Sequence, residues 1–340
     1  MDKVFKYELF NKMIRDFAVN EVKPLAHEVD EQERFPYETV EKMAKLGLMG
    51  IIVPKEYGGM GGDYKMYIKA VEELSKVCAT TGVILSAHTS LCIAPIMEYG
   101  NEEQKKKYLP KLASGEWLGA FGLTEPNAGT DANNQTTTAV KEGDHWVLNG
   151  SKIFITNAGP ANVYFVIAVT GRNPKGVECA AFIVEKGFPG FSVGKKELKM
   201  GIRGSSTCEL IFENCIVPEA NLVGKIGEGV KMALKTLDGG RVGISAQALG
   251  IAEGALEATV AYVKERKQFN KPISAFQNTQ FCLADLYTKI NAASLLVERA
   301  TEAKQNKSPM LGMYAAQAKL FAAETAMEVT TKCVQLHGGY

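Results

Sequence analysis

Two short stretches of the chain carry side chains that could hold a flat, polar ligand. The first, FGLTEPNAGTD (residues 121–131), combines threonine hydroxyls with turn-forming residues that leave backbone amides exposed. The second, KIFITNAG (residues 152–159), places the ring of Phe154 and the hydroxyl of Thr156 on one face of a strand. Hydrogen-bonding groups beside a stacking surface suit an aromatic heterocycle. Taken alone, each stretch is more typical of an ordinary loop or of a core strand that ends in a turn.

Two further stretches place charged side chains at predicted helix ends. DGGRVG (residues 238–243) is predicted to open a long helix, where Arg241 would oppose the helix dipole unless an anion lies close. Asp238 could instead cap this helix and pair with the arginine. In ERKQFNKP (residues 265–272), Arg266 follows a helix C-terminus, where it either complements the dipole or binds a phosphate.

Several function classes lack their sequence signatures. No GxGxxG follows a predicted strand, and neither GxxxxGKS/T nor GxSxG occurs, so a Rossmann site, a P-loop and a hydrolase nucleophile elbow are not supported. The 39 Lys and Arg balance the 38 Asp and Glu, which gives no reason to expect nucleic acid or an anionic membrane as a partner. The four histidines show no metal-ligand spacing, so we expect no metal site.

The composition predicts a cytoplasmic protein without a membrane partner. No apolar run reaches about eighteen residues, the length that a membrane-spanning helix needs. The N-terminus, MDKVFKYELF, lacks the apolar stretch of a signal peptide. The seven cysteines are scattered and form no CxxC pair, which fits a reducing compartment.

Hydrophobic periodicity divides the elements that carry these stretches into three parts. Residues 1–116 are predicted to be helical, residues 117–226 to form about seven short strands, and residues 227–340 to form long helices. The strands predict a compact antiparallel barrel or sandwich. The long helices are predicted near 229–266, 276–305 and 309–336. This order predicts an α+β protein whose parts pack against one another.

Capping and turn residues predict several element boundaries. Pro36 and Gly47 bracket a predicted helix, and Asn101 is predicted to cap another. Between the strands, tight turns are predicted at residues 143–144 (Gly-Asp) and 149–150 (Asn-Gly).

Six stretches together resemble the acyl-CoA dehydrogenase family. In chain order they are FGLTEPNAGTD, GSKIFITN, KMGIRGS, LDGGRVGISAQALGIAEGALE, ERKQFNKPISAFQ and VQLHGGY, and they follow the family's order and approximate spacing. The resemblance runs from near residue 5 to residue 340 and is closest to bacterial short-chain (butyryl-CoA) dehydrogenases. It implies an N-terminal helical domain (1–116), a middle β-domain (117–226) and a C-terminal four-helix bundle (227–340), with FAD between the last two.

The resemblance also implies ligand roles for individual residues. Contacts to FAD of the same chain would come from Phe121, Leu123, Thr124, Thr130, Phe154, Ile155 and Thr156. Contacts to FAD of a neighbouring subunit would come from Arg266, Gln268, Gln277, Gln335, Gly338 and Gly339. Contacts to the CoA ester would come from Thr130, Asp238 and Arg241. Shared FAD sites imply at least a dimer, and the family is usually a homotetramer. Many members carry Trp where Phe154 stands, which keeps the stacking ring but removes an indole donor.

The implied reaction is FAD-dependent α,β-dehydrogenation of a short-chain acyl-CoA to trans-2-enoyl-CoA. A carboxylate base removes the α-proton, the β-hydride passes to the flavin, and electrons leave to an electron-transfer flavoprotein. Residues 82–96 match the helix that floors the acyl pocket in this family. Their large side chains Leu85, Leu91 and Ile93 predict a preference for acyl groups of four to six carbons. The alternatives are an acyl-CoA oxidase and a non-catalytic relative that binds flavin or CoA esters.

Neither family position for the base carboxylate is filled in this sequence. One position precedes Arg241 and is occupied by Gly240. The other lies in a Tyr-Glu-Gly-Thr motif after the HGGY turn, and that motif does not occur within residues 1–340. No catalytic residue is therefore named in these residues. We expect the base glutamate beyond Tyr340, and we expect that the chain lacks the last helix of the bundle.

Overall fold

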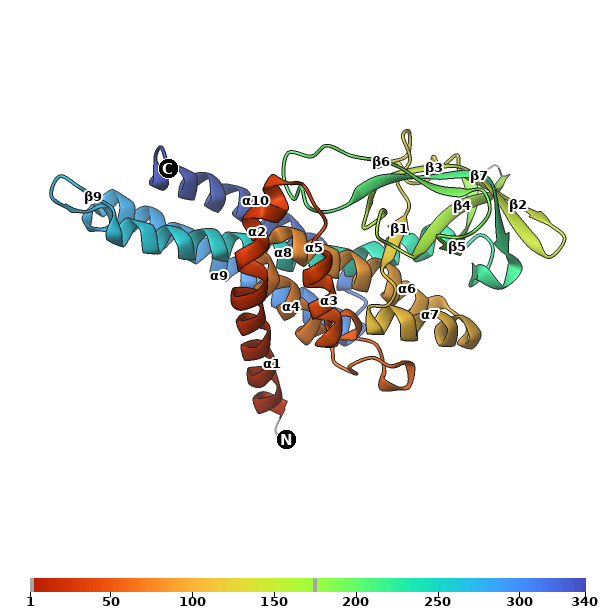
Figure 1. Cartoon of the computed structure of the whole chain (residues 1–340), viewed down its shortest axis with the longest axis horizontal. Helices are drawn as coiled ribbons and strands as arrows, with labels where there is room; N and C mark the ends of the chain where they lie inside the picture. The colour runs from red at the N-terminus through yellow and green to blue at the C-terminus, as the bar shows by residue number, and fades with distance from the viewer. Residues whose placement is uncertain (1–2, 174–175) are drawn as a thin grey trace. The chain divides into compact units, whose positions relative to one another are not determined.

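The computed structural model describes residues 3–173 and 176–340, which form two compact units (Figure 1). The helical unit comprises Met1–His27, Asp63–Val83 and Arg241–Tyr340. The sheet unit comprises Glu28–Gly62 and Ile84–Gly240. The α+β fold class predicted from the sequence is confirmed, whereas the domain limits at residues 116 and 226 stay a prediction.

The helical unit contains the long C-terminal helices that periodicity predicted. Its helices are α1 (Lys3–Phe17), the π-helical turn η1 (Ala18–Val22), α2 (Lys23–Glu31), α4 (Tyr64–Val77), α5 (Ala79–Ala87), α8 (Gly229–Glu265), α9 (Gln277–Gln305) and α10 (Leu311–His337), of which α2, α5 and α8 also supply residues to the sheet unit. Helices α9 and α10 pack along each other, and α4 packs against both α1 and α9. The short connection between α9 and α10 makes them antiparallel neighbours.

Two glycines let α4 and α8 cross at backbone contact. A Cβ atom at Gly250 would lie 2.3 Å from the carbonyl oxygen of Glu72, and one at Gly254 would lie 2.1 Å from that of Lys76. Beside the crossing, Lys76 Nζ lies 2.7 Å from Glu253 Oε2. The small residues of α8 therefore allow the two helices to approach closely.

The sheet unit begins with helices whose ends carry the predicted capping signals. They are α3 (Tyr37–Lys45), α6 (Ala94–Tyr99) and α7 (Glu102–Ser114), with 3-10 turns at Leu48–Gly50, Lys55–Tyr57 and Glu219–Asn221. Pro36 is the N-cap residue of α3, and Gly47 follows its end with φ 74°. Asn101 forms a capping box with Gln104 at the start of α7. These predicted boundaries are confirmed.

The segment Ala79–Tyr99 forms one continuous apolar helix in which the π-helical turn η4 (His88–Ile93) separates α5 from α6. By length and hydropathy it is the kind of helix that could cross a membrane, which the sequence analysis did not anticipate. However, 83% of its apolar window is buried inside the protein, as in the core helix of a globular domain.

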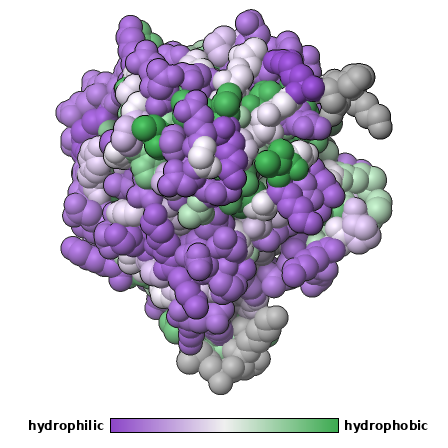
Figure 2. All heavy atoms as spheres, turned by 90° about the vertical axis from the view of Figure 1, so that its right-hand side faces the viewer, coloured by the Kyte–Doolittle hydropathy of each residue, from purple (hydrophilic) through white to green (hydrophobic). Residues whose placement is uncertain are grey.

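The face of the molecule in Figure 2 is mostly hydrophilic, with apolar side chains in small groups.

The strands of the sheet unit form one large sheet. They are β1 (Gly119–Gly122), β2 (Thr138–Glu142), β3 (His145–Thr156), β4 (Val163–Asn173), β5 (Gly176–Glu185), β6 (Phe191–Lys196), β7 (Thr207–Pro218) and β8 (Leu222–Val223). Their order is β6-β7-β3-β2-β4-β5-β8, and β1 pairs with β4. The predicted antiparallel pattern holds except that β1 and β2 each run parallel to β4. On one face, Trp146 packs edge-on against Phe182, with 5.4 Å between ring centroids.

Of the two tight turns predicted between strands, one is present and the other is not. Gly143, with φ 60°, and Asp144 join β2 to β3 as predicted. The predicted turn at Asn149-Gly150 is wrong, because β3 continues through both residues with a register shift between Leu148 and Gly150. At Gly150, φ is 137° and a Cβ would lie 2.7 Å from Thr137 Cα. The glycine therefore serves a bulge where another strand comes close, which gives the same sequence signal as a turn.

Candidate active site

The loop 121–131 lies directly against β3, so the structure brings the first two candidate stretches together. The Ile153 amide donates a hydrogen bond of 2.8 Å to the carbonyl oxygen of Thr124. Phe121 and Leu123 are buried, and Phe121 stacks on Phe165 with 6.2 Å between ring centroids. The two threonines of the loop differ, because Thr124 is half-buried and Thr130 is exposed.

An ion pair that the sequence analysis missed joins the loop to the strand. Lys152 Nζ lies 2.6 Å from Glu125 Oε1, and the two side chains are 0% and 1% exposed. The ammonium group also donates to Gln135 Oε1 at 2.8 Å and to the Leu123 carbonyl oxygen at 3.2 Å. Burial alone would raise the pKa of Glu125, but the Lys152 charge and hydrogen bonds from the backbone hold it down, at about 2. The carboxylate is therefore ionised and fully engaged.

Phe154 is displayed outward by an unusual backbone conformation. Its φ is 59°, which is uncommon for a residue with a Cβ and marks local strain. The β3·β7 register shifts between Lys152 and Ile155, and the ring of Phe154 is 60% exposed. Ile155 points inward and is buried, whereas Thr156 is half-buried. Phe154 and Thr156 are thus both more exposed than Ile155, and their sharing of one face stays a prediction.

The exposed ring and the neighbouring hydroxyls fit an aromatic cofactor. Within residues 3–173 and 176–340, the hydroxyls of Thr124 and Thr156 make no hydrogen bond to the protein. The exposed Phe154 can offer stacking, and the half-buried threonines on β3 and on the adjoining loop can offer hydrogen bonds, to a flat heterocycle. FAD supplies such a ring, and its isoalloxazine accepts a hydride when bound.

The start of β1, which leads into the loop, is anchored by two buried side chains. The Gly119 amide donates to His88 Nδ1 at 3.0 Å, and His88 Nε2 lies 3.1 Å from the Leu112 carbonyl oxygen, so Nε2 carries the proton. Burial lowers the pKa of His88 to about 4, which keeps the ring neutral. Asn157 Nδ2 donates to the carbonyl oxygens of Ile84 and Gly119, at 3.1 and 3.4 Å. These residues are structural supports, which no motif in the sequence indicated.

Residues assigned to a neighbouring subunit's FAD lie in the helical unit. Arg266 follows α8, and its guanidinium lies over the Tyr340 ring at 5.3 Å from the centroid. Gln335 and Gly338 line a hollow of about 460 Å³ at the end of α10, together with Thr331, Lys332 and Val334. Gly338 has φ 68°, and Gly339 follows it beyond the helix.

Side-chain contacts hold the end of α10 against α8. His337 stacks on Tyr262, with 4.2 Å between ring centroids, and its Nε2 lies 3.2 Å from Thr259 Oγ1. Gln268 is exposed on the short hairpin of β9 (Lys267–Gln268) and β10 (Lys271–Pro272), which precedes a 3-10 turn at Ile273–Ala275. Gln277 is exposed at the first position of α9.

The predicted helix start at residues 238–243 is wrong. Helix α8 begins at Gly229, so Asp238 and Arg241 lie well inside it. Neither the capping role of Asp238 nor the unfavourable dipole position of Arg241 applies there. Gly240 is buried, and a Cβ at this position would lie 2.8 Å from Leu91 Cδ2. Gly240 allows close packing inside the helix. In the sequence, the two consecutive glycines had resembled the signal of a helix start.

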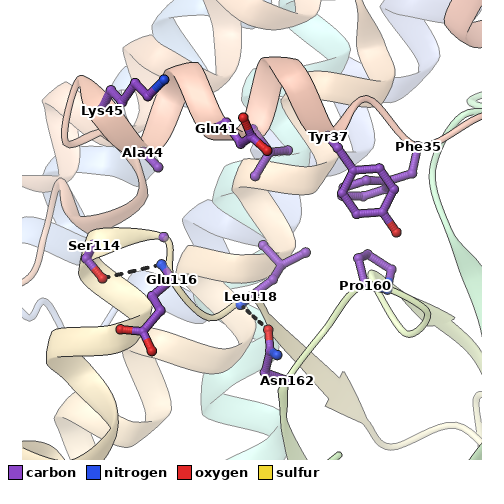
Figure 3. Close-up of a pocket in the computed structure, with 12 residues that line it drawn as sticks. Phe35, Tyr37, Glu41, Ala44, Lys45, Ser114, Glu116, Leu118, Pro160 and Asn162 are labelled. Atoms are coloured by element: carbon purple, nitrogen blue, oxygen red, sulfur yellow. Dashed lines mark hydrogen bonds between the residues drawn. The ribbon is translucent and has the colours of Figure 1, made fainter.

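A second hollow, of about 540 Å³, lies in the sheet unit between α3, the end of α7 and the β3–β4 connection (Figure 3). The rings of Phe35 and Tyr37 lie near Pro160 there, and the Leu118 amide donates to Asn162 Oδ1 at 3.1 Å. None of the sequence-predicted site residues lines this hollow. We therefore do not place the cofactor in it.

Comparison with known proteins decides the family. Sequence models of the N-terminal, middle and C-terminal domains of acyl-CoA dehydrogenases match residues 6–116, 120–215 and 227–340. The short-chain-specific acyl-CoA dehydrogenase of Clostridium acetobutylicum is 60% identical over 333 residues, which cover 98% of this chain and 88% of that protein. The chain belongs to the acyl-CoA dehydrogenase family. The predicted family and its FAD-dependent oxidoreductase chemistry are therefore confirmed.

Solved structures of related acyl-CoA dehydrogenases have the same fold. Butyryl-CoA dehydrogenase from Megasphaera elsdenii matches with a TM-score of 0.95 and 48% identity, over 98% of this chain and 88% of that chain. A structure from work on the electron transferring flavoprotein of Acidaminococcus fermentans matches with a TM-score of 0.95 and 53% identity, over 98% and 87%. An acyl-CoA dehydrogenase from Bacillus anthracis in complex with FAD matches with a TM-score of 0.89 and 36% identity, over 98% and 60%.

Proposed function

We propose that this acyl-CoA dehydrogenase oxidises short-chain acyl-CoA thioesters to trans-2-enoyl-CoA and passes the electrons to an electron-transfer flavoprotein. The observation that carries the proposal is the exposed ring of Phe154 on its left-handed backbone, together with the hydroxyls of Thr124 and Thr156, which bond to none of the described residues. The short-chain specificity of the Clostridium acetobutylicum relative and the butyryl-CoA activity of the Megasphaera elsdenii enzyme support the substrate class.

The residues of the sheet unit have distinct roles in this proposal. Phe121, Leu123 and Ile155 form the apolar support on which the flavin ring lies, and Phe154 stacks against it. Thr124 and Thr156 donate hydrogen bonds to the flavin edge. Thr130, which is exposed, reaches either the flavin phosphate region or the thioester. Asp238 and Arg241 contact the CoA ester from α8.

We propose that the FAD site is completed by a second copy of the chain. Arg266, Gln268, Gln277, Gln335, Gly338 and Gly339 would reach the FAD of that copy, as they do in the family pattern. The helical unit offers an apolar surface for assembly, because α10 exposes large apolar side chains at a spacing of seven residues. They are Met313, Leu320, Met327 and Val334, exposed by 44%, 60%, 69% and 70%. We expect a homotetramer, as is usual in the family, and light scattering of the purified protein measures it.

We propose that none of the described residues supplies the base for the α-proton. Gly240 has no side chain, and Glu125 is held ionised by Lys152 with a pKa of about 2, which makes it a poor proton acceptor. Gly240→Glu would place a carboxylate beside Arg241, at the modest cost of displacing the end of the Leu91 side chain. If residues 1–340 lack the base, this variant should turn over butyryl-CoA faster by about 10²-fold or more. An unchanged or lower rate would contradict the proposal.

Anaerobic titration of the FAD-loaded protein with butyryl-CoA tests the proposed function. The flavin should lose its visible colour as trans-2-enoyl-CoA forms, and an electron-transfer flavoprotein should restore it. Colour restored equally fast by oxygen would indicate an acyl-CoA oxidase. A protein that binds FAD and keeps its colour with every chain length would indicate a non-catalytic relative.

A further inference from the structure

The Glu125–Lys152 ion pair joins the two stretches that we assign to the flavin. Glu125 lies in the loop directly after Thr124, and Lys152 lies on β3 two residues before Phe154. We propose that this pair is a positioning device, which fixes the separation between the loop hydroxyl of Thr124 and the outward face of Phe154 and Thr156. The inference rests on the proposed placement of the flavin between these groups.

The Lys152 ammonium group binds residues at the start of the loop and just after its end. Lys152 Nζ donates to Leu123 and Glu125 at the start of the loop, and to Gln135 after its end, at 3.2, 2.6 and 2.8 Å. An ammonium has three N–H donors, so each one has an acceptor. The position of Nζ on β3 therefore determines where both ends of the loop can lie.

The Glu125 carboxylate binds the residues that lead into β2. Glu125 Oε2 accepts hydrogen bonds from the Thr136 amide at 2.6 Å and the Thr136 hydroxyl at 2.8 Å, and Oε1 accepts one from the Thr137 amide at 3.0 Å. The Thr137 hydroxyl in turn donates to the Ser151 carbonyl oxygen at 3.0 Å. One carboxylate thus connects the loop, the residues that lead into β2, and β3.

The part of the loop after Ala128 has little packing of its own. Thr130 and Asp131 are exposed, and a Cβ at Gly129 would meet no atom within 4 Å. An apolar pair of similar volume in place of a buried ion pair is often neutral or stabilising, so stability alone does not require charges at this site. Charged groups instead fix the relative positions of the segments that they join, because hydrogen bonds to an ammonium and a carboxylate are directional and apolar contacts are not.

The double variant Glu125→Gln/Lys152→Met separates positioning from stability. Removing one charge alone leaves its partner buried and unpaired, which destabilises the fold. In the double variant, the single amide oxygen of the introduced glutamine can still accept from Thr136, while its NH2 group then faces the Thr137 amide and no longer accepts from it. The ammonium that binds Leu123 and Gln135 is lost. Lys141→Met, which removes one half of an exposed ion pair with Glu219, is the matched control. The measurements are the Tm of the apo protein, the Kd for FAD and the visible circular dichroism of the bound flavin.

A positioning role predicts an apo protein that still unfolds cooperatively, with a Tm lowered only as far as the lost hydrogen bonds require, a Kd for FAD at least about 10-fold higher, and an altered flavin dichroism. The control should leave all three unchanged. A double variant that binds FAD with the Kd and dichroism of the wild type would overturn the inference. A wild-type protein that binds no FAD would instead overturn the proposed function, so the two failures are distinguishable.

A milder pair of variants decides the matter if the double variant does not fold. Thr136 is exposed, and Thr136→Val removes only its hydroxyl bond to Glu125, whereas Thr136→Ser retains it. The valine variant should raise the Kd for FAD by about 2- to 10-fold, as expected for one hydrogen bond, and serine should restore it. Equal affinities for valine, serine and wild type would overturn the inference.

Discussion

The left-handed backbone at Phe154 predicts that glycine is more stable than alanine at this position, the reverse of the usual order in a strand. Its φ is 59° although 60% of its side chain is exposed, so packing of the ring contributes little to the conformation. A residue with a Cβ loses about 1–2 kcal/mol in this region, and glycine does not. In an ordinary strand the order is opposite, because glycine is less stable than alanine by about 0.5–1 kcal/mol.

Phe154→Gly should therefore have a larger free energy of unfolding than Phe154→Ala. Subtracting the entropic cost of glycine from the relief of strain leaves a difference of about 1 kcal/mol. Urea titration of the two apo variants measures it directly. Val140 supplies the control, because it is 56% exposed on the regular strand β2. There the glycine variant should be less stable than the alanine variant.

The same variants should bind FAD more weakly than the wild type. Both lose the ring that we place against the flavin, and an aromatic contact is worth about 0.5–1.5 kcal/mol, or about 2- to 12-fold in Kd. Phe154→Trp should keep wild-type affinity, since it retains a stacking surface. If Phe154→Ala were as stable as Phe154→Gly, the strain at this position would not exist. If both bound FAD like the wild type, the ring would not contact the flavin.

Three further predictions concern other residues of the site. Arg266→Ala should weaken FAD binding at low salt, and the difference from wild type should shrink as salt screens the proposed phosphate contact; equal Kd values at low salt would return Arg266 to a helix-end role. Activity should peak at four to six acyl carbons and change about 4-fold per methylene, and Leu91→Ala should move the optimum to longer chains; a wild-type peak at twelve carbons would contradict this. The stability that the ionised Glu125 contributes should be complete above its unfolded pKa of about 4.5 and be lost as pH falls toward its folded pKa of about 2. The unfolding free energy of wild type should thus fall relative to the Glu125→Gln/Lys152→Met variant across that window, by at most about 1.4 kcal/mol per pH unit, and a constant difference would refute the pKa shift.

Local sequence patterns were sufficient for most elements of this fold. The 3.6-residue periodicity located α9 and α10, and the Asn101 cap located the start of α7. Patterns with two physical explanations were not sufficient. Asn149-Gly150 is a turn signal that here marks a bulge, because the backbone near Thr137 leaves no room for a side chain.

The site could be predicted only as far as its motifs extended. The loop 121–131 and the strand with Phe154 were recognisable, since their polar and aromatic residues stand out from their surroundings. The Glu125–Lys152 pair was not, because a lysine in a strand is normally solvent-exposed, and its partner lies 27 positions away in sequence. A long-range buried charge pair has no periodicity, so only the fold reveals it.

The burial of Lys152 has a consequence for chemical reactivity. Acyl thioesters slowly transfer their acyl group to free amines, so a protein that handles them risks modifying its own lysines. The Lys152 amine is 0% exposed, and three oxygen acceptors surround its nitrogen. Burial lowers the pKa of Lys152, but a fully buried nitrogen held by three acceptors cannot be reached by a thioester. Burial therefore protects Lys152 from acylation by the substrate, although this lysine lies only two residues before Phe154.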